Sequence, residues 1–214
     1  MVESASGSRW AAWILACSVV LLFGPSVLGD FTWDDLPVIR DNVFLHSFEH
    51  AGRLFRDDFW TVSDAGVSFA SGYFRPVVKG AWLLLWVATD GAAWAFHGLN
   101  VLLHLAVTLL AVGSVARRAG VSAWSIAAVL AAAAFAFHPA RVESVGWIVG
   151  ATDLWLGFFV LLAAWAWDRI EGPRGVGLAA VFVVLAFFSK ESALLWPVVL
   201  AIELAAGSRN NLVR

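Results

Sequence analysis

Long apolar runs separated by short polar breaks are the dominant pattern along the chain. The first run ends near residue 29, and the others follow after residue 91. A helix that crosses a bilayer needs about 20 predominantly apolar residues. Hydropathy and the polar breaks together predict six membrane-spanning helices, at residues 10–29, 92–116, 122–138, 152–167, 174–189 and 191–206.

The first apolar run has three interpretations: a cleaved signal peptide, a lipoprotein signal ending at Cys17, or an uncleaved membrane helix. A signal peptide needs a basic start and a short apolar core. Here Arg9 is the one basic residue before the run, and the run is long enough to span. The residues after Cys17 read SVVLLFG, where a lipoprotein would turn polar. These features favour the uncleaved helix.

The first loop, residues 30–75, is too apolar to be a simple linker. Within it, FEHAGRLFRDDFW (48–60) spaces apolar side chains among charges, which is typical of an amphipathic helix lying on a membrane surface. The apolar stretch at 77–89 has about 13 residues, which is short for a crossing. We expect the two segments to form a lid at the membrane surface.

The topology depends on whether residues 77–89 cross the membrane. If they do not, four basic regions fall on one side: Arg9, Arg117–Arg118, residues 168–174 and the tail from Arg209 to Arg214. Lys and Arg concentrate in cytoplasmic loops, whereas a crossing at 77–89 would scatter these arginines to both sides. The predicted fold is therefore an all-α polytopic membrane protein with about six spans and with interfacial helices in the first extracytoplasmic loop.

Composition agrees with this prediction. Of the 214 residues, 61% are hydrophobic and 14% are charged, and the mean hydropathy is +0.80. A soluble domain carries about 25% charged residues. The net charge is −2 and no basic run occurs, so nothing indicates nucleic acid as a partner; the expected surroundings are a lipid bilayer. The single cysteine leaves no disulfide framework to interpret.

Polar motifs gather on the predicted extracytoplasmic face. Charged groups at membrane depth are costly and are usually functional. The motifs are WDD (33–35), YFRP (73–76), FHGLN (96–100), HPARVES (138–144), GATD (150–153) and SKES (189–192). Polar residues that come together from separate segments indicate a site.

This ordered set resembles the transmembrane half of the TMTC-like (transmembrane and tetratricopeptide repeat) O-mannosyltransferases and their bacterial relatives, within the GT-C superfamily of membrane glycosyltransferases. The resemblance runs through most of residues 30–192. It implies a GT-C fold, an extracytoplasmic active site, a polyprenyl-phosphate sugar donor and an acceptor hydroxyl on a protein. It also implies further spans and C-terminal tetratricopeptide repeats, so residues 1–214 would be an N-terminal portion. The location expected from it is a bacterial inner membrane, with the active site facing outward.

The chemistry implied by the resemblance needs few groups. A base must take the proton of the acceptor hydroxyl, and the leaving phosphate needs positive charge near it. The acidic pair of the family's first loop assigns the role of base to Asp34. Asp35 would then tune Asp34 by like-charge repulsion or orient a substrate. The alternative is that the two acids cap the next helix or solvate a loop.

Four cationic residues are candidates for binding the donor phosphate: Arg75, His138, Arg141 and Lys190. The guanidinium of Arg can grip phosphate oxygens with a forked geometry. In the alternative interpretation, Arg75 anchors the lid, and Lys190 extends to the membrane interface and pairs with Glu191.

Supporting positions are His97, Asn100, Glu143, Asp153 and Glu191. His97, Asn100 and His104 lie at i, i+3 and i+7, which is one stripe of a helix. His104 should lie about 10 Å deeper than His97, so the two cannot share a metal ion. We expect buried hydrogen bonds that fasten this helix to its neighbours; the alternative for His97 is contact with the donor phosphate. No cofactor is expected, and no ligand spacing indicates a metal; the alternative implied by the resemblance is a divalent ion at the acidic pair, as in some GT-C enzymes.

Two rival functions fit a polytopic chain with polar motifs. A transporter or lipid flippase would place ionisable groups near the bilayer midplane, beside helices broken by Gly or Pro. A non-catalytic anchoring module would leave the polar motifs apart in space. Whether the motifs converge at one end of the bundle discriminates among these functions.

Overall fold

The computed structural model describes residues 5–62, 71–123 and 125–196, with side chains from residue 10 onward. Within those ranges the secondary structure is helical and no strand occurs, so the all-α prediction is confirmed. The α-helices are α1 (Ala5–Phe23), α2 (Pro76–Thr89), α3 (Ala93–Arg118), α4 (Ile126–Ala136), α5 (Arg141–Gly146), α6 (Thr152–Arg169) and α7 (Gly172–Phe187). Shorter 3-10 or π segments cover Gly24–Leu28, Leu36–Arg40, Val43–Leu45, Phe48–Phe55, Val149–Ala151 and Glu191–Leu195.

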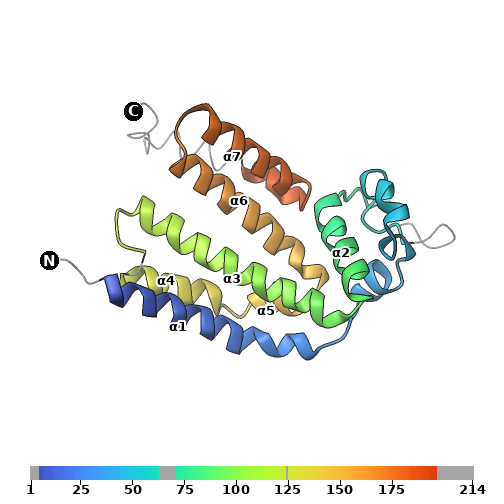
Figure 1. The fold of residues 1–214 in the computed structure, drawn as a ribbon, viewed down its shortest axis with the longest axis horizontal. Helices are drawn as coiled ribbons and strands as arrows, with labels where there is room; N and C mark the ends of the chain where they lie inside the picture. The colour runs from blue at the N-terminus through green and yellow to red at the C-terminus, as the bar shows by residue number, and fades with distance from the viewer. Residues whose placement is uncertain (1–4, 63–70, 124, 197–214) are drawn as a thin grey trace.

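Helix α3 lies at the centre of an elongated bundle (Figure 1). It packs against α1 and α4 on one side and against α6 on the other, and α7 packs on α6. Helices α1, α4 and α7 run in one direction along the bundle, while α3 and α6 run in the opposite direction. This is the alternation expected of successive membrane crossings joined by short loops.

Among the described residues, three helical stretches are long and apolar enough to cross a membrane: Trp10–Leu28, Ala93–Arg118 and Val149–Arg169. Helices α4 and α7 are apolar but shorter, and α7 closely matches the predicted span at 174–189. The predicted span at 191–206 lies largely outside the described residues. The number of spans therefore stays a prediction.

The outer surface of the bundle is apolar. Trp13, Ile14 and Leu21 of α1, Leu102 of α3 and Leu130 of α4 are all exposed. A contiguous apolar surface of this kind is costly in water and is the surface that lipid tails require. Together with the three long apolar helices, it shows that the chain is a membrane protein.

Helix α4 is shorter than predicted, and this changes the position of the segment after it. The 11 residues of α4 span about 16 Å, roughly half of a hydrocarbon core. Its last residue, Ala136, accepts a hydrogen bond at its carbonyl from His104, which lies near the middle of α3. The motif at 138–144 therefore begins beside the middle of the bundle, and α5 leads from there toward the cap end (Figure 1), so the position expected for its first residues on the end face is wrong.

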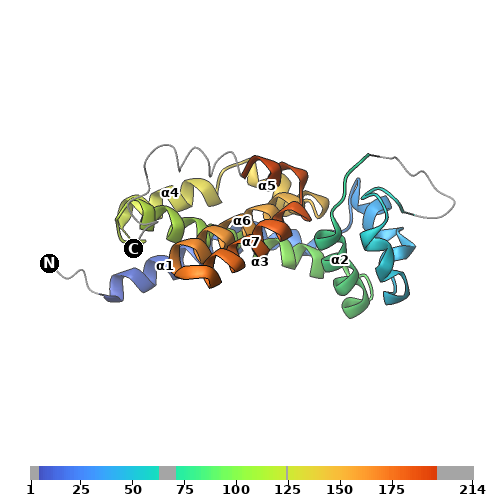
Figure 2. The same ribbon diagram turned by 90° about the horizontal axis from the view of Figure 1, so that it is seen from above.

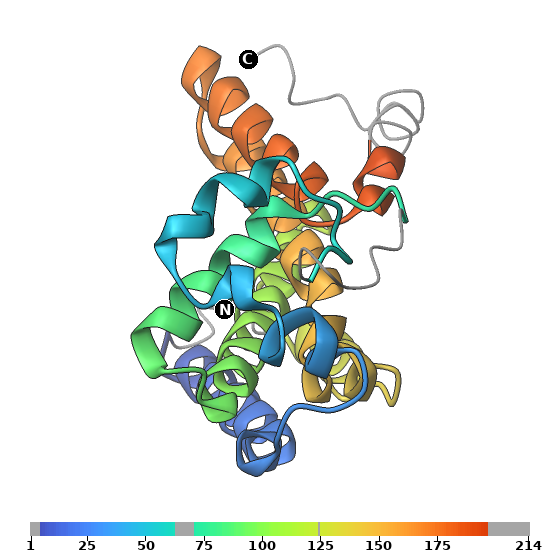
Figure 3. The same cartoon turned by 90° about the vertical axis from the view of Figure 1, so that its right-hand side faces the viewer.

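The first loop and α2 form a compact unit at one end of the bundle, here called the cap (residues 30–62 and 71–89). In Figures 2 and 3 the cap lies across the end of the bundle, with α2 next to the helices and the loop outside it. Helix α2 does not run alongside the bundle helices, which agrees with the prediction that this stretch is interfacial.

The cap is built on a hydrophobic core that it shares with Phe96 of α3 and with Ile148, although the sequence predicted only a surface lid. Val38, Ile39 and Leu45 of the loop pack with Val78 and Trp82 of α2 in this core. The expected amphipathic helix is a 3-10 helix, Phe48–Phe55, in which Leu54 is buried, while Phe48 and Phe55 remain exposed. The segment is thus a packed part of the cap that presents two phenylalanines outward.

Candidate active site

Five of the six polar motifs meet where the cap joins the bundle. The starts of α3 and α6 and the end of α7 lie at this end, beside the cap (Figure 3). Hydrogen bonds link Asp35 of the cap to Val149, just before α6, and the Arg75 side chain to Glu191, just after α7. Segments distant in sequence are therefore brought together here, as the site prediction required.

Asp35 ties the cap to the bundle. Its side chain is fully buried, and its Oδ1 accepts a hydrogen bond from the Val149 backbone N–H at 2.9 Å. Its Oδ2 accepts from the Thr32 backbone N–H at 3.1 Å. Burial raises the pKa of Asp35, and the hydrogen bonds from Thr32 and Val149 partly oppose this shift. Both oxygens are occupied, so Asp35 is a tether within the fold; its side chain makes no cap hydrogen bond to the following helix, Leu36–Arg40, which the alternative interpretation had proposed.

Asp34 differs from its neighbour in both burial and hydrogen bonding. Its side chain is half-exposed, and no hydrogen bond or ion pair to it occurs within the described part of the chain. It follows Trp33, whose backbone adopts a left-handed φ of 49°, an uncommon conformation for a bulky residue. Such strain often marks a functional turn. Of the acidic pair, Asp34 is the carboxylate that a substrate could reach.

Arg75 is held by protein groups on several sides. Its Nε and Nη2 donate to the two carboxylate oxygens of Glu191 at 3.0 and 2.8 Å, a bidentate pair. Its guanidinium also lies 4.8 Å from the ring centres of both Phe59 and Tyr73. Because the side chain is largely buried, these contacts anchor the cap to the segment after α7, as the alternative interpretation of Arg75 proposed.

Lys190 pairs with Asp153 and not with Glu191, so the alternative pairing predicted for it is wrong. Its Nζ lies 2.5 Å from Oδ1 of Asp153 at the start of α6. Because successive side chains point in different directions, Lys190 contacts α6 while Glu191 contacts the cap. The Asp153 side chain is 48% exposed, which leaves this pair open to solvent and to an incoming anion.

The polar stripe of α3 fastens this helix to its neighbours, as predicted. Asn100 Nδ2 donates to the carbonyls of Val145 and Trp147. His104 Nε2 lies 3.0 Å from the Ala136 carbonyl. His97 is buried next to the carbonyl of Asp30, and its Nδ1 has no partner among the described residues.

His138 and Arg141 do not join the group at the cap, whereas the backbone carbonyl of Glu143 lies against Gly150 in the turn before α6. His138 is exposed and lines a cavity of about 300 Å³ between the end of α1 and α5, and its Nδ1 accepts from the Ala140 N–H. The Arg141 guanidinium lies 4.9 Å from the Phe135 ring centre, and its buried Nε is unpartnered within the described chain. Of the four cations expected near one phosphate, two are thus displaced toward the middle of the bundle.

Lys79 of α2 is a buried cation that sequence reasoning did not select. It is 2% exposed, and its Nζ donates to the Asp58 carbonyl at 3.3 Å. Burial lowers the pKa of Lys79, opposed by the charges of Asp57 and Asp58. The one signal available was a single lysine within the apolar stretch VVKGAWLLLW. In the described residues, no group of three or more His, Cys, Asp or Glu side chains is placed to hold a metal ion.

Comparison with known proteins finds the same relatives across most of the chain. Protein O-mannosyl-transferase tmtc2 of Xenopus laevis is 31% identical over 186 residues, or 86% of this chain. Protein O-mannosyl-transferase Tmtc2 of Drosophila melanogaster is 30% identical over 194 residues, and human Protein O-mannosyl-transferase TMTC4 is 28% identical over 202 residues. The resemblance to the TMTC-like O-mannosyltransferases is confirmed.

The aligned region is a small part of these TMTC-like relatives. It covers 22% of the Xenopus protein, 20% of the Drosophila protein and 27% of the human TMTC4. No family model matches the chain, and no solved structure matches it. The likeness therefore rests on curated TMTC-like sequences and extends over a fifth to about a quarter of their length.

Proposed function

We propose that the protein is a glycosyltransferase that moves a sugar from a polyprenyl-phosphate donor to a hydroxyl group of a protein acceptor. The observation that carries this proposal is the similarity of 86% of the chain to a protein named as an O-mannosyl-transferase. The meeting of five polar motifs at the cap supports the same conclusion. The whole protein's activity would need the further segments that its relatives possess.

In this proposal Asp34 is the general base. It is the accessible member of the acidic pair, and it lies just beyond the first apolar helix. The donor's lipid would stay in the bilayer with its phosphate at headgroup depth, while the acceptor hydroxyl arrives from the aqueous side. Asp35 acts as a positioning residue, because its bonds to Thr32 and Val149 fix the turn that carries Asp34.

Lys190 is the better of the two cap-side cations for the donor phosphate. Its partner Asp153 is exposed, and an exposed ion pair is worth only about 0–1 kcal/mol, so a phosphate could replace this carboxylate. The bidentate pair of Arg75 and Glu191 is more buried and would cost more to break. Arg75 would therefore hold the shape of the site, with Lys190 stabilising the departing phosphate.

We place the cap on the extracytoplasmic side. Arg117 and Arg118 lie at the opposite end of the bundle, where positively charged loops favour the cytoplasm. The bacterial inner membrane stays a prediction, since the relatives named above are animal proteins.

Sugar transfer in liposomes tests the proposal. Asp34→Asn should lower the rate roughly a hundredfold to ten-thousandfold, the usual contribution of general acid–base catalysis, with donor binding retained. Asp41→Asn is the matched control, because Asp41 is an exposed cap carboxylate that pairs with Arg40. Lys190→Gln should weaken donor binding. Normal transfer by Asp34→Asn would refute the role of base.

A specific observation favours transport as a second candidate function. His138 and Arg141 lie near the middle of the bundle, after a helix that ends before Pro139. Ionisable groups beside a broken helix at this depth are typical of transporters and flippases. Movement of a fluorescent polyprenyl phosphate across liposomes, lost in Arg141→Gln but retained in Asp34→Asn, would support transport over transfer.

A further inference from the structure

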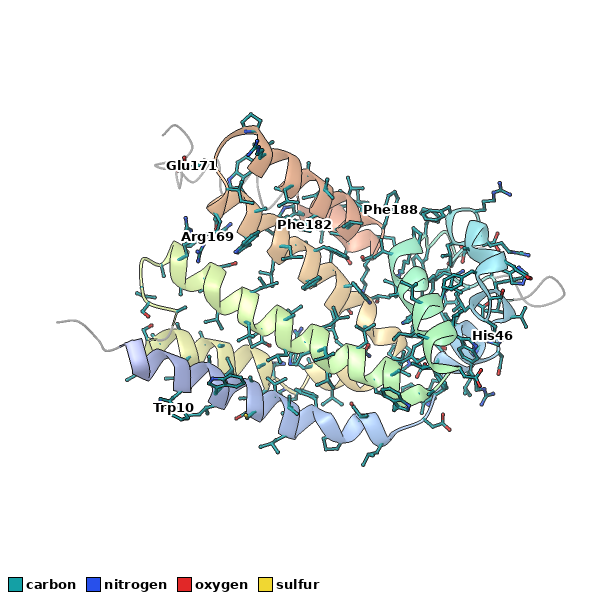
Figure 4. The ribbon with its side chains drawn as sticks, viewed as in Figure 1. Trp10, His46, Arg169, Glu171, Phe182 and Phe188 are labelled. Atoms are coloured by element: carbon teal, nitrogen blue, oxygen red, sulfur yellow. The ribbon has the colours of Figure 1, made fainter. Side chains whose placement is uncertain are left out.

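A second cavity lies between α3 and α6, at the end of the bundle opposite the cap. It has a volume of about 450 Å³ and is lined mainly by apolar side chains of these two helices, including Leu109, Leu110, Phe158, Leu162 and Trp165. Its polar rim contains Arg117, Asp168 and Arg169, the last of these labelled at this end of the bundle in Figure 4. The cavity is thus apolar along the helices and cationic where they end.

The two arginines of the rim differ in their contacts. Arg117 Nη2 donates to the Asp168 carbonyl at 2.5 Å, which fixes its side chain across the ends of α3 and α6. Arg118, which does not line the cavity, lies 3.6 Å from the Asp168 carboxylate. Arg169 has no ion pair or side-chain hydrogen bond within the ranges that the structure describes. The Asp168 carboxylate therefore pairs with Arg118 and its carbonyl with Arg117, while the guanidinium N–H groups of Arg169 stay available for a ligand.

The shape and chemistry of this cavity match an amphiphile. The apolar walls between α3 and α6 can pack against a hydrocarbon chain by van der Waals contact, because a lipid tail is as apolar as the side chains that line them. The cationic rim lies at the ends of spanning helices, where lipid headgroups are found, and Arg binds phosphate oxygens through paired N–H donors. A free phosphate ion would use the rim and leave the apolar part of the cavity unfilled.

We propose that this cavity binds one anionic phospholipid, with a chain between α3 and α6 and its phosphate on Arg169 and Arg117. Basic pockets between helices on the cytoplasmic side of membranes are suited to such headgroups. The site is on the end opposite Asp34 and does not depend on sugar transfer. It would hold the ends of α3 and α6 together in the membrane.

Native mass spectrometry of the purified protein tests this proposal, with phosphatidylglycerol and phosphatidylcholine of the same acyl chains as probes. The protein should retain one phosphatidylglycerol in preference to phosphatidylcholine. Arg169→Gln should weaken this binding roughly tenfold to a hundredfold, as expected for loss of a hydrogen bond from a charged group. Arg174→Gln is the control, because Arg174 is exposed at the start of α7 and does not line the cavity.

A second variant tests the apolar part of the site without altering its charge. No atom lies within 4 Å of the Cβ position at Gly113, which lines the cavity, so Gly113→Leu would fill the space with little strain. Gly177→Leu on α7 is the control, since its Cβ position is equally open and lies outside the cavity. Loss of phosphatidylglycerol in Gly113→Leu, with retention in Gly177→Leu, would support the proposal.

Three results would overturn the assignment. Equal retention of phosphatidylcholine would show that the headgroup is not recognised. Unchanged phosphatidylglycerol binding by Arg169→Gln would show that the phosphate lies elsewhere. Displacement of phosphatidylglycerol by millimolar inorganic phosphate would identify a site for a small anion.

Discussion

The adjacent acids Asp34 and Asp35 have separate environments despite being neighbours in sequence. Asp35 is fully buried with both oxygens accepting backbone hydrogen bonds, whereas Asp34 is half-exposed and has no such bonds in the described structure. The difference arises because the turn that begins at Thr32 points one side chain toward Val149 and the other outward. A substitution at each position should therefore affect different properties.

Asp35→Asn should lower the stability of the protein. An amide has one acceptor oxygen, so its NH₂ group would face a backbone N–H donor of Thr32 or Val149. Leaving a buried donor unpaired costs about 1–3 kcal/mol, and the free energy of unfolding in detergent should fall by this amount. Asp34→Asn should unfold like the wild type. Equal stability of the two variants would contradict the tethering role of Asp35.

Lys79 gives a prediction about pH. Its lowered pKa means that the folded state binds fewer protons than the unfolded state between that pKa and the ordinary value of 10.5, so its contribution to stability rises with pH across this window. Lys79→Met should remove this rise and raise the free energy of unfolding at neutral pH by roughly 1–4 kcal/mol. The Asp58 carbonyl would keep its bond from the Thr61 N–H. An unchanged slope in alkaline thermal unfolding would argue against a buried charge here.

At the scale of elements, the segment from α5 to the start of α6 holds the site together, because both α3 and the cap hydrogen-bond to it. Helix α5 and the turn Val149–Ala151 connect the middle of the bundle to the end that carries the cap. Asn100 binds this segment from α3, and Asp35 binds it from the cap. The segment that contains the HPARVES and GATD motifs is therefore a connector between the middle of the bundle and the end that carries the cap.

Gly150 is required by close packing within this connector. A Cβ at this position would collide with the backbone carbonyl oxygen of Glu143, which cannot move aside as a flexible side chain can. Gly150→Ala should destabilise the protein by roughly 1–3 kcal/mol, as overpacking does, and should displace the Val149 N–H from Asp35. Gly177→Ala on α7 should have no such effect, because its Cβ position is open. Thermal unfolding of both variants in detergent makes the comparison, and equal melting temperatures would contradict it.

At the scale of the whole molecule, the two ends of the bundle have opposite characters. The cap end gathers the polar motifs, while the other end carries Arg117, Arg118 and Arg169 around Asp168. This polarity predicts that the ends face different sides of the membrane, and α2 remains on the side of the cap.

Cysteine labelling with a membrane-impermeant reagent tests this orientation after Cys17 is replaced by serine. A cysteine at Glu49, exposed in the cap, should label from the extracytoplasmic side. A cysteine at Glu171, in the exposed turn before α7, should label only after the membrane is opened. Labelling of both positions from one side would invalidate the topology and, with it, the separation of the two proposed sites.

The sequence by itself determined the membrane class, the all-α fold and the approximate positions of the long helices. Apolar length is a local property, and a run of about 20 apolar residues has few alternatives to a spanning helix. It also predicted the hydrogen-bonding stripe of Asn100 and His104, because helical periodicity alone places them on one face.

Tertiary structure alone decided which polar residues meet. The pairing of Lys190 with Asp153, the buried tether from Asp35 to Val149 and the depth of His138 depend on the spatial arrangement of helices that are distant in sequence. The short length of α4 set that depth, and a hydropathy pattern that continues past a helix end cannot reveal it. The sequence alone could not show that Asp34 is accessible and Asp35 is buried, because burial results from packing against segments more than a hundred residues away.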